Sequence, residues 1–296
     1  MLHSMTGFAS GKGAHEGYSW TWELRSVNGK GLDLRLRVPD WVAGLEAGLR
    51  ARLGKSMARG NVSMALRVLA EDQAGTLSIN APQMQAVLAA MAQVEARAME
   101  QGLSLAPANS ADVLSLRGVL ETSTEEQDTT ELAKALLADF ETVLKSFLEM
   151  RATEGAALAE MLSTHLDDIA RLTDEAAKAA EARKPEVAAN LRRALAQVME
   201  NADGVDAARV AQELAMLAVK ADVTEEISRL GAHVDAARDL LAQGSPIGRK
   251  LDFLAQEFNR EANTLCSKSQ STQLTTLGLE LKTVIDQMRE QVQNVE

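Results

Sequence analysis

The sequence is poor in the residues that build covalent or cysteine-bound frameworks. Cys266 is the single cysteine among 296 residues, so no disulfide can form within one chain, and a cysteine-based zinc site is excluded. No apolar run is long enough to cross a membrane, and the first residues, MLHSMTGFASGKG, lack the apolar core of a secretion signal. These absences predict a cytoplasmic, soluble protein that does not act in a membrane.

Aromatic residues are also scarce, at 3% of the chain. Alanine, leucine, glutamate, glutamine and methionine are plentiful instead, and these residues favour helices because they lose little side-chain entropy there. Hydrophobic residues make up 46% of the sequence and charged residues 25%, enough to bury a core and stay in solution. The length allows two ordinary domains, or one compact domain and one elongated one.

Charge is unevenly distributed along the chain. Residues 1–70 contain ten Lys and Arg against five Asp and Glu, a net charge of +5. The whole chain carries −11, so the remaining residues carry −16. A basic N-terminal segment therefore precedes an acidic remainder, an asymmetry that bears on which surface could meet an anionic partner.

Apolar and polar residues alternate in three N-terminal segments, 18–28, 32–38 and 60–68. This period of two predicts strands of a sheet with one buried face, and residues 41–57 are expected to form a helix packed on it. The residues expected to face inward are Trp20, Trp22, Leu24, Leu32, Leu34, Leu36, Val38, Val62, Met64, Leu66 and Val68. Arg35, Arg37 and Arg67 are expected to face outward, either as a solvated surface or as a surface that binds anions.

The pattern changes to the helical period after about residue 75. Residues 130–183 contain no proline and only Gly155, which predicts one very long helix, with a new helix beginning near Pro185. We expect an α+β fold with a strand-rich domain at 1–75, a helical segment with a projecting antiparallel arm at 76–204, and a C-terminal helical domain at 205–296.

Three helices are expected in the C-terminal domain, at about 206–242, 248–269 and 271–295. The last carries apolar residues at intervals of three and four, typical of a packing seam: Leu274, Leu277, Leu281, Val284, Met288 and Val295. The seam and the length of the middle helices exceed what one chain is expected to cover, so we predict a homo-oligomer.

Two polar stripes lie on the first two of these helices. Asp222, Glu226, Arg229 and His233 follow at spacings of four, three and four, and Glu257, Glu261, Thr264 and Lys268 lie beside an apolar stripe. Carboxylates and an imidazole on one face suit a divalent ion such as Mn²⁺, or acid–base chemistry. The alternative is a network of salt bridges between helices, and spacing alone favours this alternative.

Several motifs resemble the YicC/YloC family. SMTGFA at 4–9, ELRSVNGK at 23–30 and RGNV at 59–62 are similar to its N-terminal domain. DVTEEISRLGAH at 222–233 and GRKLDFLAQEFNREANTLCSKS at 248–269 resemble its C-terminal signature. The resemblance implies a bacterial endoribonuclease that acts on single-stranded or small regulatory RNA, uses a divalent metal, typically Mn²⁺, and assembles as a hexamer.

Under this interpretation, Glu226, His233, Glu257 and Glu261 are candidates for metal ligation or acid–base chemistry. Arg260 and Lys268 would balance the carboxylates or contact the scissile phosphate. The residues expected to bind RNA are Arg35, Arg37, Arg67 and Arg249. Two other functions remain open: an oligomer that clamps RNA without cleaving it, and a structural helical assembly whose polar stripes only fix subunit packing.

Overall fold

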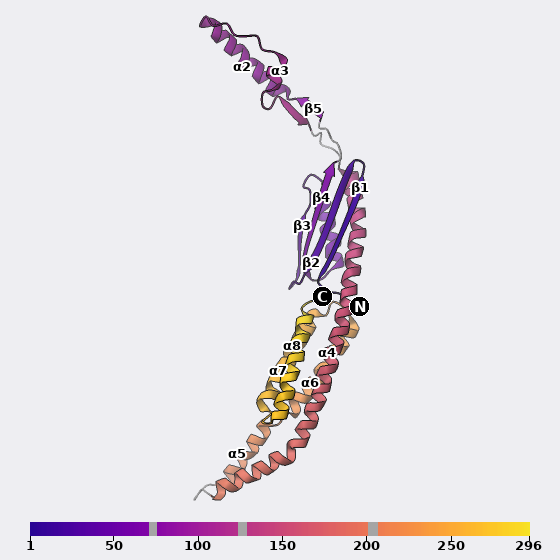
Figure 1. The fold of residues 1–296 in the computed structure, drawn as a ribbon, viewed down its shortest axis with the longest axis vertical. Coiled ribbons are helices and arrows are strands. Elements are labelled where there is room, and N and C mark those ends of the chain that lie inside the picture. The colour runs from indigo at the N-terminus through magenta and orange to yellow at the C-terminus, as the bar shows by residue number, and fades with distance from the viewer. Residues whose placement is uncertain (71–75, 124–128, 201–206) are drawn as a thin grey trace.

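The computed structural model describes residues 1–70, 76–123, 129–200 and 207–296, and the molecule is elongated (Figure 1). A four-stranded sheet occupies the middle and a bundle of long helices extends from one end of it. A small unit, made of two short strands and two helices, lies beyond the other end. The predicted α+β class is confirmed. No helix in the described ranges is long and apolar enough to span a membrane.

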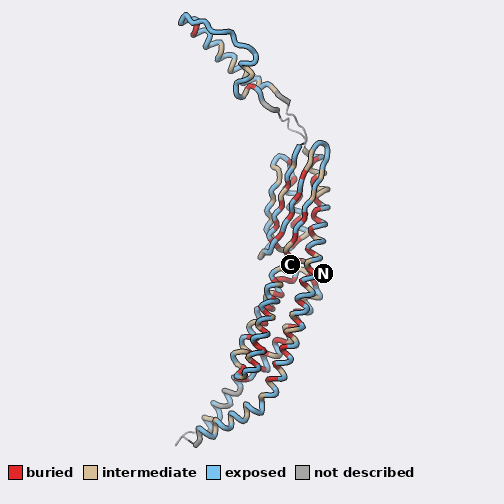
Figure 2. Tube along the Cα trace, in the orientation of Figure 1, coloured by how far each residue is buried: buried red, intermediate tan, exposed pale blue. Residues whose placement is uncertain are grey.

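The sheet contains β1 (Gly7–His15), β2 (Tyr18–Val27), β3 (Leu32–Arg37) and β4 (Gly60–Ala70). The strand order is β1-β2-β4-β3, with β3 parallel to β4 and the other pairs antiparallel. The three predicted segments are all strands with the expected alternation, buried on one face and exposed on the other (Figure 2). Helix α1 (Leu45–Ser56) covers the buried face with Leu45, Leu49 and Leu53.

Strand β1 was not among the segments that alternation singled out. Its buried face carries small residues because a helix passes close above it. A Cβ on Gly11 would lie 2.6 Å from a side-chain carbon of Val143, so a larger residue there would collide with that helix. Glycine thus takes the place of the large apolar residues that mark the other strands.

That helix is α4 (Thr130–Glu200), 71 residues long. Its first part packs on the sheet through Leu136, Phe140 and Phe147, and its middle part, from Leu158 to Ala179, packs in the bundle. One helix therefore belongs to both hydrophobic cores. The predicted new start at Pro185 is wrong: α4 continues through it, although a proline inside a helix removes one backbone hydrogen bond.

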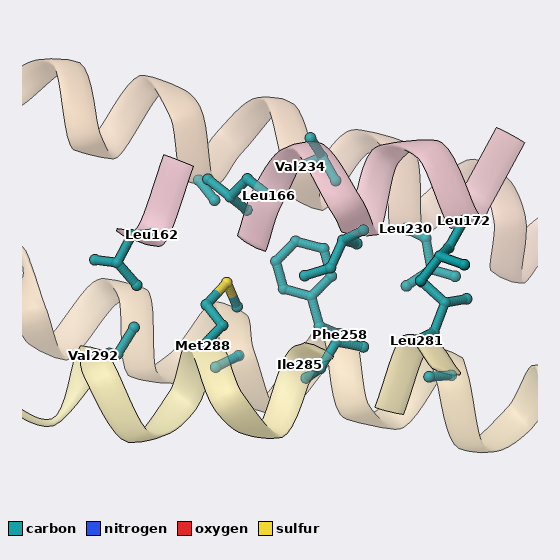
Figure 3. Packing of buried hydrophobic residues seen from close by; sticks show 14 of the residues in the cluster. Leu162, Leu166, Leu172, Leu230, Val234, Phe258, Leu281, Ile285, Met288 and Val292 are labelled. Carbon is teal, nitrogen blue, oxygen red and sulfur yellow. The ribbon is translucent and has the colours of Figure 1, made fainter. Parts of the chain in front are cut away.

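The bundle consists of α4, α6 (Thr224–Gln243), α7 (Gly248–Lys268) and α8 (Thr272–Val292). Phe258 lies at its centre, among leucine and isoleucine side chains from the other helices (Figure 3). The predicted helix 206–242 is instead two helices, α5 (Ala207–Lys220) and α6. The chain breaks there because the Asp222 carboxylate accepts hydrogen bonds from the backbone N–H and hydroxyl of Thr224, at 3.0 and 2.6 Å.

Helix α5 runs beside the last part of α4, and the two extend beyond the bundle as the antiparallel arm (Figure 1). The seam on α8 has a different role from the one predicted. Leu274, Leu281 and Val295 are buried within the chain's own bundle core. This seam therefore does not require a second copy of the chain.

The two ends of the chain meet at the junction between the sheet and the bundle (Figure 1). Ser4 forms an isolated bridge with Val295, and the backbone N–H of Glu296 donates to the carbonyl of His3 at 3.0 Å. Arg151 of α4 is fully buried beside them. The junction is thus a tight, hydrogen-bonded assembly of both terminal segments and α4.

The small unit contains β5 (Thr76–Ile79), α2 (Ala81–Glu100), α3 (Ser110–Leu114) and β6 (Leu120–Ser123). β5 and β6 pair antiparallel. Most of its described residues are exposed or half-buried (Figure 2).

Candidate metal centre between two helices

Helices α6 and α7 form an antiparallel hairpin, joined by the turn at 244–247 (Figure 1). Each helix buries an apolar stripe, which includes Leu230 and Val234 on α6 and Phe258 and Ala262 on α7. Polar residues flank these stripes, so the two predicted polar stripes meet at the edge of the interface. The antiparallel direction brings the start of α6 next to the end of α7.

Three of the predicted site residues come together at this edge. Ligand atoms of His233, Glu257 and Glu261 all lie within 4.8 Å of one another. Glu261 is only 3% exposed, whereas His233 and Glu257 are half-buried. A buried carboxylate needs a charged or hydrogen-bonding partner, and the opening between these three residues is where a cation would satisfy it.

The imidazole of His233 is oriented by packing. Its ring meets Phe258 edge-on, with the ring centroids 5.7 Å apart. Its Nε2 atom is buried and has no hydrogen-bond partner among the described residues. A nitrogen in this state is unsatisfied, and a cation bound by the neighbouring carboxylates would give it a partner.

Glu226, also predicted as a ligand, lies nearer the other end of the interface. Its Oε1 accepts a hydrogen bond of 2.8 Å from Nζ of Lys268. This contact raises the pKa of Lys268 above that of an ordinary lysine. The other carboxylate oxygen, Oε2, is buried without a partner in the described part of the chain. Glu226 and Lys268 thus form an ion pair between the helices, beside the three clustered residues.

Two arginines border the cluster. Arg229 donates to Oε1 of Glu261 at 3.3 Å and to Oε1 of Glu225 at 2.5 Å. Arg260 lies 3.6 Å from Glu257, three residues away on the same helix, and is largely exposed. The cluster therefore has positive charge on both sides, which offsets the repulsion between its carboxylates.

The predicted RNA-binding arginines lie on two different parts of the molecule. Arg35, Arg37 and Arg67 all project from the exposed face of the sheet. Arg35 pairs with Asp33 at 3.2 Å, whereas the side chains of Arg37 and Arg67 have no hydrogen bond or ion pair within the described ranges. These two border the same surface cleft, of about 660 Å³.

Arg249 lies apart from the sheet arginines, in the first turn of α7. It lines a separate cleft of about 770 Å³ at the junction, together with Arg59 and Phe253. The sequence interpretation did not single out Arg59 or Phe253. Phe253 precedes Glu257 by four residues, and this spacing is the signal that could have placed it on the same side of α7.

The fold and this cluster define an α+β protein with a candidate metal centre on a helical hairpin and a basic sheet face. The N-terminal region of the family described as endoribonuclease YicC-like matches residues 2–160, and its C-terminal region matches residues 176–296. Similar proteins include a "Probable endoribonuclease YicC" of Haemophilus influenzae, 38% identical, and one of Clostridioides difficile, 28% identical, each aligned over the full length of both chains. This chain belongs to the YicC-like endoribonuclease family, which indicates a nuclease.

Proposed function

We propose that this chain is a divalent-metal-dependent endoribonuclease whose reaction centre is the His233–Glu257–Glu261 cluster. The observation that carries the proposal is the approach of these three ligand atoms to within 4.8 Å of one another. Two carboxylates and an imidazole suit Mn²⁺, because oxygen and imidazole ligands are those that such ions accept. A divalent ion held there would polarise a phosphate oxygen and lower the pKa of a water molecule.

The neighbouring residues support this assignment through charge. Arg229 holds Glu261 by a hydrogen bond of 3.3 Å, which fixes that carboxylate in its buried position. Arg260 is exposed beside Glu257, so its guanidinium can contact a phosphate that reaches the cluster and stabilise the charge that develops during cleavage. Lys268 neutralises the buried Glu226, and this pair keeps the ends of α6 and α7 in register.

The proposed substrate is single-stranded or small regulatory RNA, in the cytoplasm. The outward arginines of the sheet, Arg35, Arg37 and Arg67, would hold phosphates without reading sequence. Arg249 would do the same beside the cluster. The family resemblance further supports a hexamer. Light scattering tests this part, because a mass close to the 31.8 kDa of one chain would contradict it.

Salt bridges also favour a second candidate function. Lys268 with Glu226 and Arg229 with Glu261 are ion pairs between helices, which a purely structural bundle would use for packing. A protein with this bundle and the basic sheet face could clamp RNA or build an assembly without cleaving RNA itself.

Cleavage of a labelled single-stranded RNA by the purified protein separates the two functions. We expect cleavage in Mn²⁺ and none in EDTA. The His233→Ala variant should lose cleavage and keep RNA binding. A wild-type protein that binds RNA but leaves it intact in every divalent ion tested would favour the non-catalytic clamp.

A further inference from the structure

The cleft of about 770 Å³ at the junction is built from three parts of the chain. The last turns of α6 contribute Leu240 and Gln243, the first turns of α7 contribute Arg249 and Phe253, and Arg59 comes from the segment before β4. The cleft therefore lies along the same α6–α7 hairpin as the cluster, towards the sheet.

Phe253 is the most exposed aromatic residue on the described surface, at 61%. The other two exposed aromatic residues have partners: Phe8 lies under the guanidinium of Arg25, 5.9 Å away, and Trp41 packs against Tyr18 with ring centroids 6.0 Å apart. Phe253 has no ring or cation contact within the described ranges. Its ring borders the cleft as a free apolar surface.

The position of Phe253 links the cleft to the cluster. Arg249, Phe253, Glu257 and Glu261 follow one another at intervals of four residues on α7. Four residues advance a helix by about 6 Å and turn it by about 40° beyond a full turn. Phe253 thus lies about one turn from Glu257, and a strand following this side of α7 would meet the aromatic ring next to the cluster.

Positive side chains border the same cleft. The side chains of Arg249 and Lys250 are exposed and have no hydrogen bond or ion pair in the described part of the chain. Arg59 donates from Nη2 to the carbonyl of Gly29 at 3.2 Å, and its Nε is buried without a partner. The acids of the cleft are Asp239 and Glu296. Since Glu296 is already paired with Arg151, the cleft retains an excess of positive charge.

The backbone at the start of α7 is not available to an anion. The N–H groups of Ile247 and Gly248 already donate to the backbone oxygen of Glu296, at 2.8 and 3.1 Å. Gly248 allows this approach, because a Cβ there would lie 2.0 Å from the carbonyl oxygen of Val295. Any phosphate in the cleft must therefore be held by side chains.

We propose that this cleft binds one nucleotide of a single-stranded RNA, next to the nucleotide that is cleaved. The base stacks on Phe253, and Arg59, Arg249 and Lys250 hold the phosphate. This inference rests on the proposed function for its substrate, and it adds a binding subsite and an aromatic residue that positions the strand. Stacking accepts any base, because every base has a π-face, so the subsite would position RNA without selecting its sequence.

Binding of a fluorescently labelled, single-stranded oligoribonucleotide in EDTA tests the subsite without any cleavage. Removing a stacking aromatic costs about 1–3 kcal/mol per base, so Phe253→Ala should raise the Kd about fivefold or more. Phe253→Leu, which keeps an apolar side chain, should weaken binding similarly, whereas Phe253→Trp should bind like the wild type. Leu279→Ala, which truncates another exposed apolar residue, should leave the Kd unchanged.

The salt dependence separates the two halves of the subsite. Phe253→Ala should leave the slope of log K against log salt unchanged, because stacking releases no counterions. Arg249→Ala should reduce that slope by about 0.7, the value for one phosphate contact on a single strand.

Wild-type affinity in Phe253→Leu would overturn the stacking assignment, whether or not the protein cleaves RNA. A mononucleotide that binds as tightly as the oligonucleotide would overturn the assignment to an RNA strand. Absence of cleavage by the wild type in every metal, with the Phe253 effects intact, would instead overturn the proposed nuclease and support the subsite.

Discussion

Arg151 and Glu296 form a buried ion pair at the junction, in which Nη2 of Arg151 donates to Oε2 of Glu296 at 2.8 Å. Arg151 also donates from Nε to the carbonyl of Ser4 at 2.5 Å. The second carboxylate oxygen of Glu296 accepts from the backbone N–H of Ala58 at 2.6 Å. One pair thus connects α4, the loop before β4 and both terminal segments.

Glu296→Ala should therefore strongly destabilise the protein. It leaves the guanidinium of Arg151 buried and unpaired, a situation that costs about 3–5 kcal/mol. Urea denaturation measures the loss in the free energy of unfolding. Glu23→Ala is the matched control, because Glu23 pairs with Arg25 on the surface and exposed pairs contribute about 0–1 kcal/mol. Equal effects of the two substitutions would contradict the role of the buried pair.

Much of the fold could be predicted from periodicity, because alternation and helical spacing record which side of an element is buried. The strands β2, β3 and β4 and the helices α7 and α8 followed in this way. β1 was harder, because Gly11 faces the core where an apolar residue would normally mark the strand. The seam on α8 was predicted correctly as a packing surface, but a seam does not show whether its partner lies in the same chain.

The arginines on the sheet give the second prediction. Replacing Arg35, Arg37 and Arg67 together by alanine should weaken RNA binding and reduce its salt slope by up to about three, one for each lost phosphate contact. Arg171→Ala is the control, since Arg171 is exposed but paired with Asp168 and Glu175 on α4. A triple variant with the wild-type salt slope would show that this face is only solvated.

The contact between Lys268 and Glu226 gives a pH prediction. The hydrogen bond from Lys268 to Glu226 raises the pKa of Lys268 in the folded protein, so the folded state holds this proton more tightly than the unfolded state. The stabilisation is therefore complete below about 10.5, the ordinary value for lysine, and is lost as the pH rises through the higher folded value.

Free energies of unfolding measured from pH 9 upwards test this direction. The wild type should lose stability over this range more steeply than the double variant Glu226→Gln/Lys268→Met, which lacks the titrating pair but leaves no charge stranded. Parallel profiles for the two proteins would show that the pair contributes nothing to the alkaline loss.

The candidate site was predictable in part. Spacing on each helix identified His233, Glu257 and Glu261, because residues three or four apart share a face. Spacing did not show that Glu226 would pair with Lys268, because that contact depends on how α6 and α7 are aligned against each other. The same alignment places Arg229 against Glu261. Contacts between helices are set by the packing of Leu230, Val234 and Phe258, which the spacing within one helix does not record.

Glu257→Gln is the sharpest test of the chemistry. Glu257 is half-buried, and its one ion pair in the described part is with Arg260, at 3.6 Å. Its neutralisation should thus change the free energy of unfolding by no more than about 1 kcal/mol. The same change removes one of three charged or imidazole ligands, so Mn²⁺ affinity measured by calorimetry should fall at least about tenfold, and Mn²⁺-dependent cleavage of RNA should be lost.

Glu225→Gln provides the matched control for this last prediction. Glu225 is an exposed acid on α6 that also pairs with an arginine, Arg229, but it is not one of the three clustered residues. It should keep wild-type metal affinity and cleavage. If Glu257→Gln instead lowered the stability by about 3–5 kcal/mol while cleavage continued, Glu257 would belong to a packing network. Only loss of metal binding and cleavage with the fold intact assigns the carboxylate to the reaction centre.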